Sequence, residues 1–107
     1  MTTERIRELN DALRTTFEGG TVVTTPLVRI LGNEKMAELL QRVRTFTAFD
    51  PDNDPHGEHD FGSVEIDGRE FFFKIDYYDT SMMGASDDPA DPGKTSRVMT
   101  IMRADEY

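Results

Sequence analysis

The dipeptide Asp67-Gly68 constrains the fold of this chain more than any other feature of its sequence. Residues 61–66 and 69–79 flank it, and both segments alternate between apolar and polar side chains. Such a dipeptide favours the two-residue turns that join antiparallel strands, because aspartate and especially glycine tolerate the positive φ angles of those turns. The sequence therefore predicts a β-hairpin in which Ile66 pairs with Arg69 and the rest of the register follows from that pair.

The predicted register gives the hairpin two different faces. One face is apolar and is expected to lie against the core: Val64, Ile66, Phe71, Phe73, Ile75 and Tyr77. The opposite face mixes acids with aromatic rings: Phe61, Ser63, Glu65, Glu70, Phe72, Lys74, Asp76 and Tyr78. Gly62 is expected to leave room for the Phe73 ring across the ladder. Glu65 faces Glu70, and two like charges directly across a ladder are mildly destabilising. The presence of both acids therefore suggests that something other than stability requires them.

Apolar residues at three- and four-residue steps predict two helices ahead of the hairpin. The first apolar stripe is Ile6, Leu9, Leu13 and Phe17, and the second is Met36, Leu39, Leu40 and Val43. Gly19-Gly20 should end the first helix, and Asn33 can cap the second. Short strands are predicted at 21–25 and 97–102, with one helical turn at 27–31, a long loop at 80–95 and a polar tail.

Helices followed by strands indicate a single α+β domain over residues 1–107. We expect two N-terminal helices packed on a small, mostly antiparallel sheet of three to five strands. The helices should cover the face that carries Phe71 and Phe73.

The net charge of −9 comes from the second half of the chain. Residues 1–49 hold six acids and seven bases, whereas residues 50–107 hold fifteen acids and five bases. Binding to phosphate needs a basic footprint, so no direct binding to nucleic acid is expected. An acidic surface instead attracts basic proteins or cations, or simply keeps a small protein soluble. The sequence has no cysteine, no apolar leader and no long apolar run. We therefore expect a cytoplasmic protein with no membrane association.

Residues 50–60 concentrate the polar chemistry of the chain, with five carboxylates and both histidines. Two prolines and a glycine predict a loop. Imidazole and carboxylate together suit a divalent metal, and the candidate ligands are His56, His59 and Asp60. The alternative is that the histidines hydrogen-bond to acids of their own loop. No other cofactor is expected.

The sequence contains no complete catalytic template. No serine lies in a Gly-x-Ser-x-Gly elbow, and both common phosphate-binding glycine motifs are missing. We therefore assign no catalytic residue, and a metal-dependent enzyme is the alternative that stays open.

Several runs of the chain resemble one known family. They are residues 53–62, 72–79, 88–92 and 100–102, together with the segment 10–20. These runs are similar to the pattern of a small bacterial family called domain of unknown function 3768. The family has no assigned activity, so the resemblance implies no catalytic role. Genes of this kind often resemble the cargo of plasmids and other mobile elements, which implies a target in a defence or replication machine.

Two hypotheses for function follow. The first is a small acidic protein-interaction module that inhibits a nucleic-acid-binding machine by phosphate mimicry, as anti-CRISPR or anti-restriction proteins do. The residues expected to bind the partner are Asp50, Asp52, Asp54, Glu58, Asp60, Glu65, Glu70, Phe72, Asp76 and Tyr78. The second is a metal-binding protein or metal-dependent enzyme centred on residues 56–60. The oligomeric state is left open.

Overall fold

The structure, a computed structural model, describes residues 2–107. Within these residues the elements are α1 (Thr2–Thr16), β1 (Thr21–Thr24), α2 (Pro26–Arg29), α3 (Asn33–Arg44), β2 (Phe61–Ile66), β3 (Arg69–Tyr78), β4 (Ser96–Arg103) and a 3₁₀ turn, η1 (Ala104–Glu106). The predicted α+β class is confirmed, with the short α2 as a third helix. No helix of this part of the chain has the length and apolar character needed to cross a membrane.

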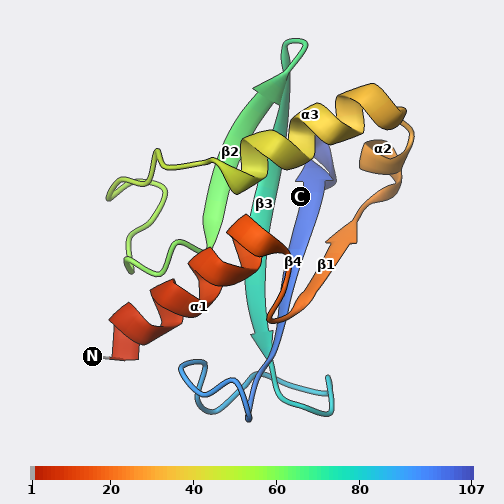
Figure 1. Ribbon diagram of the computed structural model, residues 1–107. Helices are drawn as coiled ribbons and strands as arrows, with labels where there is room; N and C mark the ends of the chain where they lie inside the picture. The colour runs from red at the N-terminus through yellow and green to blue at the C-terminus, as the bar shows by residue number, and fades with distance from the viewer. Residues whose placement is uncertain (1) are drawn as a thin grey trace.

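β2 and β3 form the predicted hairpin, and its register is confirmed. Ile66 lies opposite Arg69, and Gly62 lies opposite Phe73. Asp67 and Gly68 have φ angles of 52° and 77°, as the two-residue turn requires. The strand order is β1-β4-β3-β2, so β2 and β1 are the two edges of the sheet (Figure 1).

The sheet is mixed, because β1 runs parallel to β4. Thr21 lies opposite Val98, and Thr24 lies opposite Ile101. The other two pairings, β2 with β3 and β3 with β4, are antiparallel. A parallel pair needs a long crossover connection, and here the whole of α2, α3 and the hairpin supplies it.

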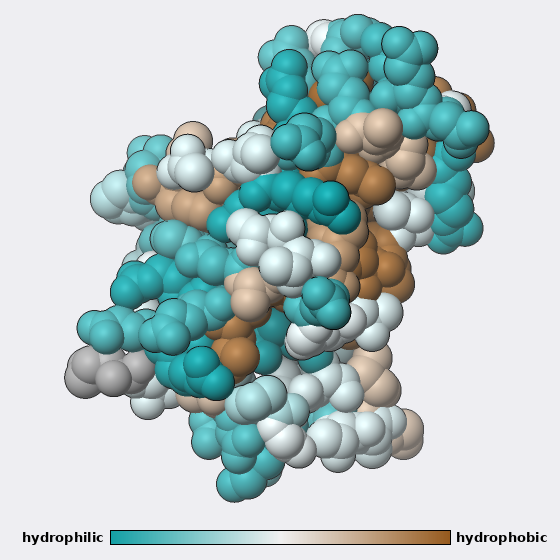
Figure 2. Space-filling view, in the orientation of Figure 1, coloured by the Kyte–Doolittle hydropathy of each residue, from teal (hydrophilic) through white to brown (hydrophobic). Residues whose placement is uncertain are grey.

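All three helices lie on one face of the sheet (Figure 1). Phe71 and Phe73 of β3 are fully buried between the two layers, as predicted, together with Met99 of β4 and Leu39 of α3. Figure 2 views the helix side, where hydrophilic residues cover most of the surface and hydrophobic surface shows mainly between the elements. The core therefore lies between the helices and one sheet face.

α1 ends earlier than its apolar pattern predicts. The helix stops at Thr16, and Phe17 itself takes the left-handed conformation with a φ of 62°, ahead of Gly19. The Phe17 ring packs on the core, and the Arg44 guanidinium lies 4.2 Å from its centroid. These contacts offset the cost of positive φ in a bulky residue. At α3, the N-cap position is Gly32 and not Asn33, which is the first helical residue.

The C-terminal residues form the 3₁₀ turn η1 and are hydrogen-bonded to the rest of the protein, so the prediction of a polar tail is wrong. The Glu106 carboxylate accepts hydrogen bonds from the Thr25 hydroxyl at 2.6 Å and from the Leu27 backbone N–H at 3.2 Å. It thereby caps α2, for which Thr25 makes no side-chain cap bond of its own. A cap supplied from the other end of the chain leaves no local signal in the sequence.

Candidate functional site

One face of the sheet is covered by none of α1, α2 and α3, and we call it the open face. The register places these residues on it: Thr21 and Val23 of β1, Phe61, Ser63 and Glu65 of β2, Glu70, Phe72, Lys74, Asp76 and Tyr78 of β3, and Val98, Thr100 and Met102 of β4, of which Val98 and Met102 are buried. The helices lie on the opposite side (Figure 1). Five of the ten residues expected to bind a partner therefore share one surface: Glu65, Glu70, Phe72, Asp76 and Tyr78.

Three aromatic rings form a cluster on the open face. The Phe61 and Phe72 centroids are 4.9 Å apart, and Tyr107 lies 5.6 Å from Phe72 and 6.0 Å from Phe61. Residues 61 and 72 come from the hairpin, whereas Tyr107 reaches the cluster from the end of η1. Sequence reasoning missed Tyr107 because it assigned the C-terminus to a polar tail.

The acids of the open face differ in how far their charge is compensated. Asp76 forms an ion pair with Lys74 at 2.9 Å, and this hydrogen bond raises the pKa of Lys74. Glu65 and Glu70 lie opposite one another and form no ion pair within residues 2–107. Glu70 accepts one hydrogen bond, from the Ser63 hydroxyl at 2.7 Å. The two glutamates therefore form the uncompensated negative charge of this face.

The acids of the loop 50–60 are largely engaged within the protein. Asp54 is 8% exposed and accepts the backbone N–H of His59 at 3.1 Å. Glu58 accepts the Tyr77 hydroxyl at 2.7 Å. Asp50 accepts two backbone N–H groups of its own turn, from residues 52 and 53. Of this group, only Asp52 is exposed without such a role. The acids after Phe49 thus do not form one continuous exterior.

Asp60 lies where the loop meets the open face. It is half-buried and lines a hollow of about 290 Å³ together with His56, Lys74 and Tyr107. Burial raises the pKa of the Asp60 carboxyl, and the nearby charges of Glu58 and Asp54 raise it further.

The two histidines lie in different surroundings. The His59 ring stacks on Phe49, with centroids 3.9 Å apart and planes 2° apart, and its Nδ1 lies 2.9 Å from Asp11 Oδ1 on α1. Its Nε2 lies 3.8 Å from the Asp54 carboxylate. His56 is exposed beside the hollow at Asp60. No three His, Asp or Glu side chains among the described residues are placed to hold a metal ion, so the predicted set of His56, His59 and Asp60 is not brought together.

A buried polar network, centred on Asn10, was missed by the sequence analysis. Asn10 is fully buried, and its Nδ2 donates to the Glu58 carbonyl at 3.0 Å and to the Tyr77 hydroxyl at 2.8 Å. Its Oδ1 accepts from Arg97 Nε at 2.7 Å, and Arg97 also donates to the Pro89 carbonyl. A signal existed, because Asn10 lies four residues after Ile6 on the buried side of α1.

The network is suited to holding loops in place. Burial lowers the pKa of Arg97, although its guanidinium lies 5.2 Å from the Tyr77 ring centroid. Burial and the hydrogen bond to Glu58 raise the pKa of Tyr77, so this tyrosine stays a neutral donor. Neither group is thereby prepared for proton transfer near neutral pH. The network joins α1, the loop 50–60 and the loop 80–95 to the sheet.

A second polar anchor lies at the end of α3. Arg14 is nearly fully buried and donates to the carbonyls of Val43, Arg44 and Phe46 at 3.3, 3.3 and 2.9 Å. Val43 and Arg44 lie in the last turn of α3, whose carbonyls have no N–H partner within the helix, and a cation there compensates the negative end of the helix dipole. Arg14 also pairs with Asp11 at 3.0 Å, which links this anchor to His59.

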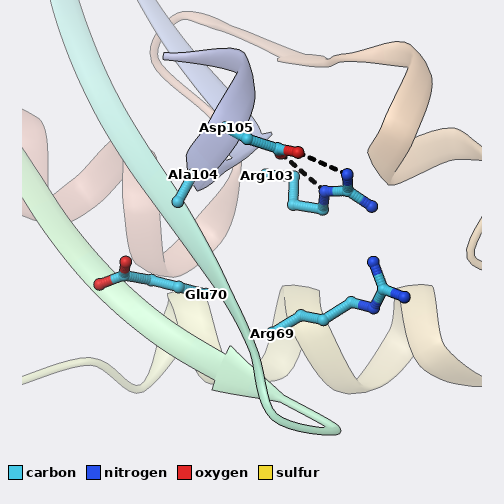
Figure 3. A pocket seen from close by; sticks show the side chains of 5 residues that line it. All are labelled: Arg69, Glu70, Arg103, Ala104 and Asp105. Carbon is cyan, nitrogen blue, oxygen red and sulfur yellow. Dashed lines mark hydrogen bonds and ion pairs between the residues drawn. The ribbon is translucent and has the colours of Figure 1, made fainter.

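A shallow hollow of about 210 Å³ lies between the hairpin turn and η1 (Figure 3). The Arg69 and Arg103 guanidinium groups extend to the same side of it, and Glu70 lies on the other side (Figure 3). Asp105 holds Arg103 through two bonds of 2.7 and 2.5 Å. Since one arginine is neutralised and an acid flanks the hollow, it is a weak candidate for anion binding.

The family comparison agrees with the resemblance seen in the sequence. Residues 24–106 match the model of a family described as Protein of unknown function (DUF3768). No curated protein and no solved structure matches the chain. The matched region contains the loop 50–60, the whole hairpin and β4, and so every open-face residue of β2, β3 and β4. Because the match covers well over half of its length, the chain belongs to the DUF3768 family.

Proposed function

We propose that this chain is an acidic protein-interaction module that binds a basic, nucleic-acid-binding protein through the open face. The observation that supports this most directly is the combination of an aromatic cluster with Glu65 and Glu70, which have no cation partner in the described part of the chain. The opposite face of the sheet is covered by helices, so the open face is the one available to a partner.

The acids and the rings contribute differently to such binding. Exposed carboxylates steer a basic partner and select against acidic ones. Each exposed ion pair adds only about 0–1 kcal/mol, because water and salt screen it. Aromatic rings at the centre of an interface supply most of the affinity. Each ring contacts the other two, and Phe72 lies closest to both, at 4.9 and 5.6 Å, so it is the expected anchor.

The finer form of the proposal is an inhibitor that occupies the nucleic-acid site of its target. Glu65 and Glu70 lie directly opposite one another on neighbouring strands, about 5 Å apart, and so form a compact pair of negative charges. The carboxylates of the open face can thus imitate phosphates. A cytoplasmic defence machine, such as a CRISPR surveillance complex or a restriction endonuclease, is the class of target. Asp54 and Glu58 take no part, because their carboxylates are bound inside the protein.

Competition for DNA tests this proposal. A purified surveillance complex and a restriction endonuclease are each loaded with fluorescent DNA and titrated with the protein at several salt concentrations. We expect release of DNA from a susceptible machine, weakening as salt rises. The double variant Glu65→Gln/Glu70→Gln and the variant Phe72→Ala should each need about tenfold more protein for the same effect.

The matched control is Glu4→Gln/Glu8→Gln, which removes the same charge from α1 on the helix side. It should compete as well as the unmodified protein. Unchanged DNA binding by every machine at every salt concentration would refute the proposal. Equal losses in the two double variants would show that net charge matters and the open face does not.

A further inference from the structure

We propose that the basic partner docks by adding an extended segment as a fifth strand along the free edge of β2. This inference rests on the proposed function, and it specifies which part of the partner binds and how. The occupant is a segment in β conformation with lysine or arginine on alternate residues. Main-chain hydrogen bonds to an exposed edge supply affinity in this mode, and the alternate side chains supply specificity.

The register identifies which backbone groups of β2 are free. Ile66 and Arg69 flank a two-residue turn, so they form a hydrogen-bonded pair, and such pairs alternate along the ladder. The N–H and C=O groups of Ile66, Val64 and Gly62 therefore face β3. Those of Ser63 and Glu65 face away, and β2 has no other neighbour in the sheet of residues 2–107.

The free stretch runs from Ser63 to the turn. Towards the other end of β2, the loop 45–60 lies close by, and a Cβ at Gly62 would come within 3.0 Å of the Phe46 ring. Beside the free stretch is a hollow of about 260 Å³, lined by Ser63, Val64, Glu65, Gly68 and Glu70. A side chain of an added strand can enter this hollow.

The two edges of the sheet differ in how they are protected. Natural edges are blocked by lysine, proline, bulges or covering loops. On the β1 edge, Arg29 donates to the Thr24 carbonyl at 2.9 and 2.6 Å, and Pro26 lies two residues after the end of the strand. β2 has neither lysine nor proline, and its one charged residue is Glu65. The β2 edge is thus the one left open to pairing.

Charge decides what kind of strand fits this edge. Glu65 already faces Glu70, and like charges directly across a ladder are unfavourable. A residue of an added strand would lie about 5 Å from Glu65 on the same face, so a lysine or arginine there compensates both carboxylates. A second copy of this chain is disfavoured, because each copy carries a net charge of −9.

Hydrogen exchange measured by NMR tests the edge directly. The probe is a synthetic peptide of alternating lysine and valine, added to the full chain. In the free protein, the amides of Ser63 and Glu65 should exchange at least about tenfold faster than the paired amide of Val64. Saturating peptide should slow both outward amides about tenfold or more and leave the Val64 amide unchanged.

A pair of variants separates edge pairing from other contacts. Ser63→Pro removes an outward N–H without removing a bond to β3, and Ser63→Ala is its control. We expect Ser63→Pro to weaken peptide binding about tenfold and Ser63→Ala to bind like the unmodified protein. Circular dichroism confirms that both fold. If Ser63→Pro fails to fold, the exchange experiment on the unmodified protein decides the matter alone.

The possible failures are distinguishable. Outward amides that stay fast at about 1 mM peptide, or equal binding by the two Ser63 variants, would overturn edge docking. If Glu65→Gln/Glu70→Gln still weakens DNA competition in that case, the open face binds the partner without strand addition. If that double variant also has no effect, the proposed function fails as well.

Discussion

Replacing Gly62 with alanine should destabilise the protein, because the Phe73 ring occupies the space above this glycine. A Cβ at Gly62 would lie 2.4 Å from Phe73 Cε2 and 2.6 Å from Cζ. Carbon atoms in favourable contact are about 3.5–4.0 Å apart, so the ring would have to move by about 1 Å. Phe73 is fully buried, and Phe46, Phe49 and Arg14 surround its ring at centroid distances of 5.3, 6.3 and 5.8 Å.

The magnitude follows from two opposing effects. Forcing an extra methyl into a packed core costs about 1–3 kcal/mol. Replacing glycine restricts the unfolded chain and returns about 0.4–1 kcal/mol. We therefore expect Gly62→Ala to lower the free energy of unfolding by about 1–2 kcal/mol and Tm by roughly 5–15 °C for a domain of this size.

Urea denaturation followed by circular dichroism measures this loss. Ser63→Thr, at the next position of β2, keeps the hydroxyl that donates to Glu70, so it is the control and should change the free energy of unfolding by less than about 0.5 kcal/mol. In a Phe73→Leu background, which removes the clashing ring atoms, the cost of Gly62→Ala should shrink. If Gly62→Ala were as stable as the unmodified protein or more stable, the packing argument would be refuted. If Gly62→Ala lowered the free energy of unfolding equally in the Phe73→Leu background, the Phe73 ring would not be the cause of the loss.

Three further changes probe the polar interior. Asn10→Ala should lower the free energy of unfolding, measured in urea, by about 3–4 kcal/mol, because it removes three buried hydrogen bonds, one of them from Arg97. Glu8→Ala, at an exposed position of the same helix, should have little effect. Similar losses in the two variants would contradict the role given to the Asn10 network. Asp60→Asn should raise Tm near pH 7 but not near pH 3. Burial raises the pKa of the Asp60 carboxyl, so folding favours the neutral form of this group. The stability that the neutral carboxyl contributes is lost as the pH rises through its pKa in the folded state, and asparagine, which stays neutral, does not lose it. Equal shifts at both pH values would argue against burial as the cause. Addition of Zn²⁺, Mn²⁺ or Ca²⁺ should leave Tm unchanged, because the described residues offer no three-ligand set, and a clear increase with metal concentration would contradict that geometry.

The hairpin could be predicted residue by residue because its signals are local. The turn dipeptide fixes the pairing, and the alternation of side chains then determines which face is buried. Even the contact between Gly62 and Phe73 could be predicted in this way. The register alone places Gly62 opposite Phe73, and the structure shows the expected close approach of the Phe73 ring. The hydrophobic stripes of α1 and α3 are equally local, and both helices lie where the periodicity predicts, except that α1 stops at Thr16, before the last residue of its stripe.

Apart from the start of α3, which Gly32 and not Asn33 caps, the features that the sequence did not predict depend on contacts between distant parts of the chain. The pairing of β1 with β4 joins the two ends of the sequence, and no turn specifies it. The cap of α2 comes from Glu106. His59 was expected to bind a metal or the acids of its own loop, but its closest partner is Asp11 on α1. Residue types restrict what such side chains can do, and the fold decides which partner they meet.

The acidic residues of the second half of the chain are close together in the sequence but not in space. In the sequence the acids after Phe49 look like one block, yet in space the loop 50–60 lies against α1, where Arg7 donates to the Gly57 carbonyl and Asp11 holds His59. Acids that order a loop in this way contribute little to a docking surface. What is left for a partner is a pair of glutamates beside three rings, an arrangement in which charge selects the partner and ring burial holds it. If the protein binds its partner through the open face, the affinity should therefore fall with salt less steeply than a net charge of −9 suggests, since few of those charges lie at the interface.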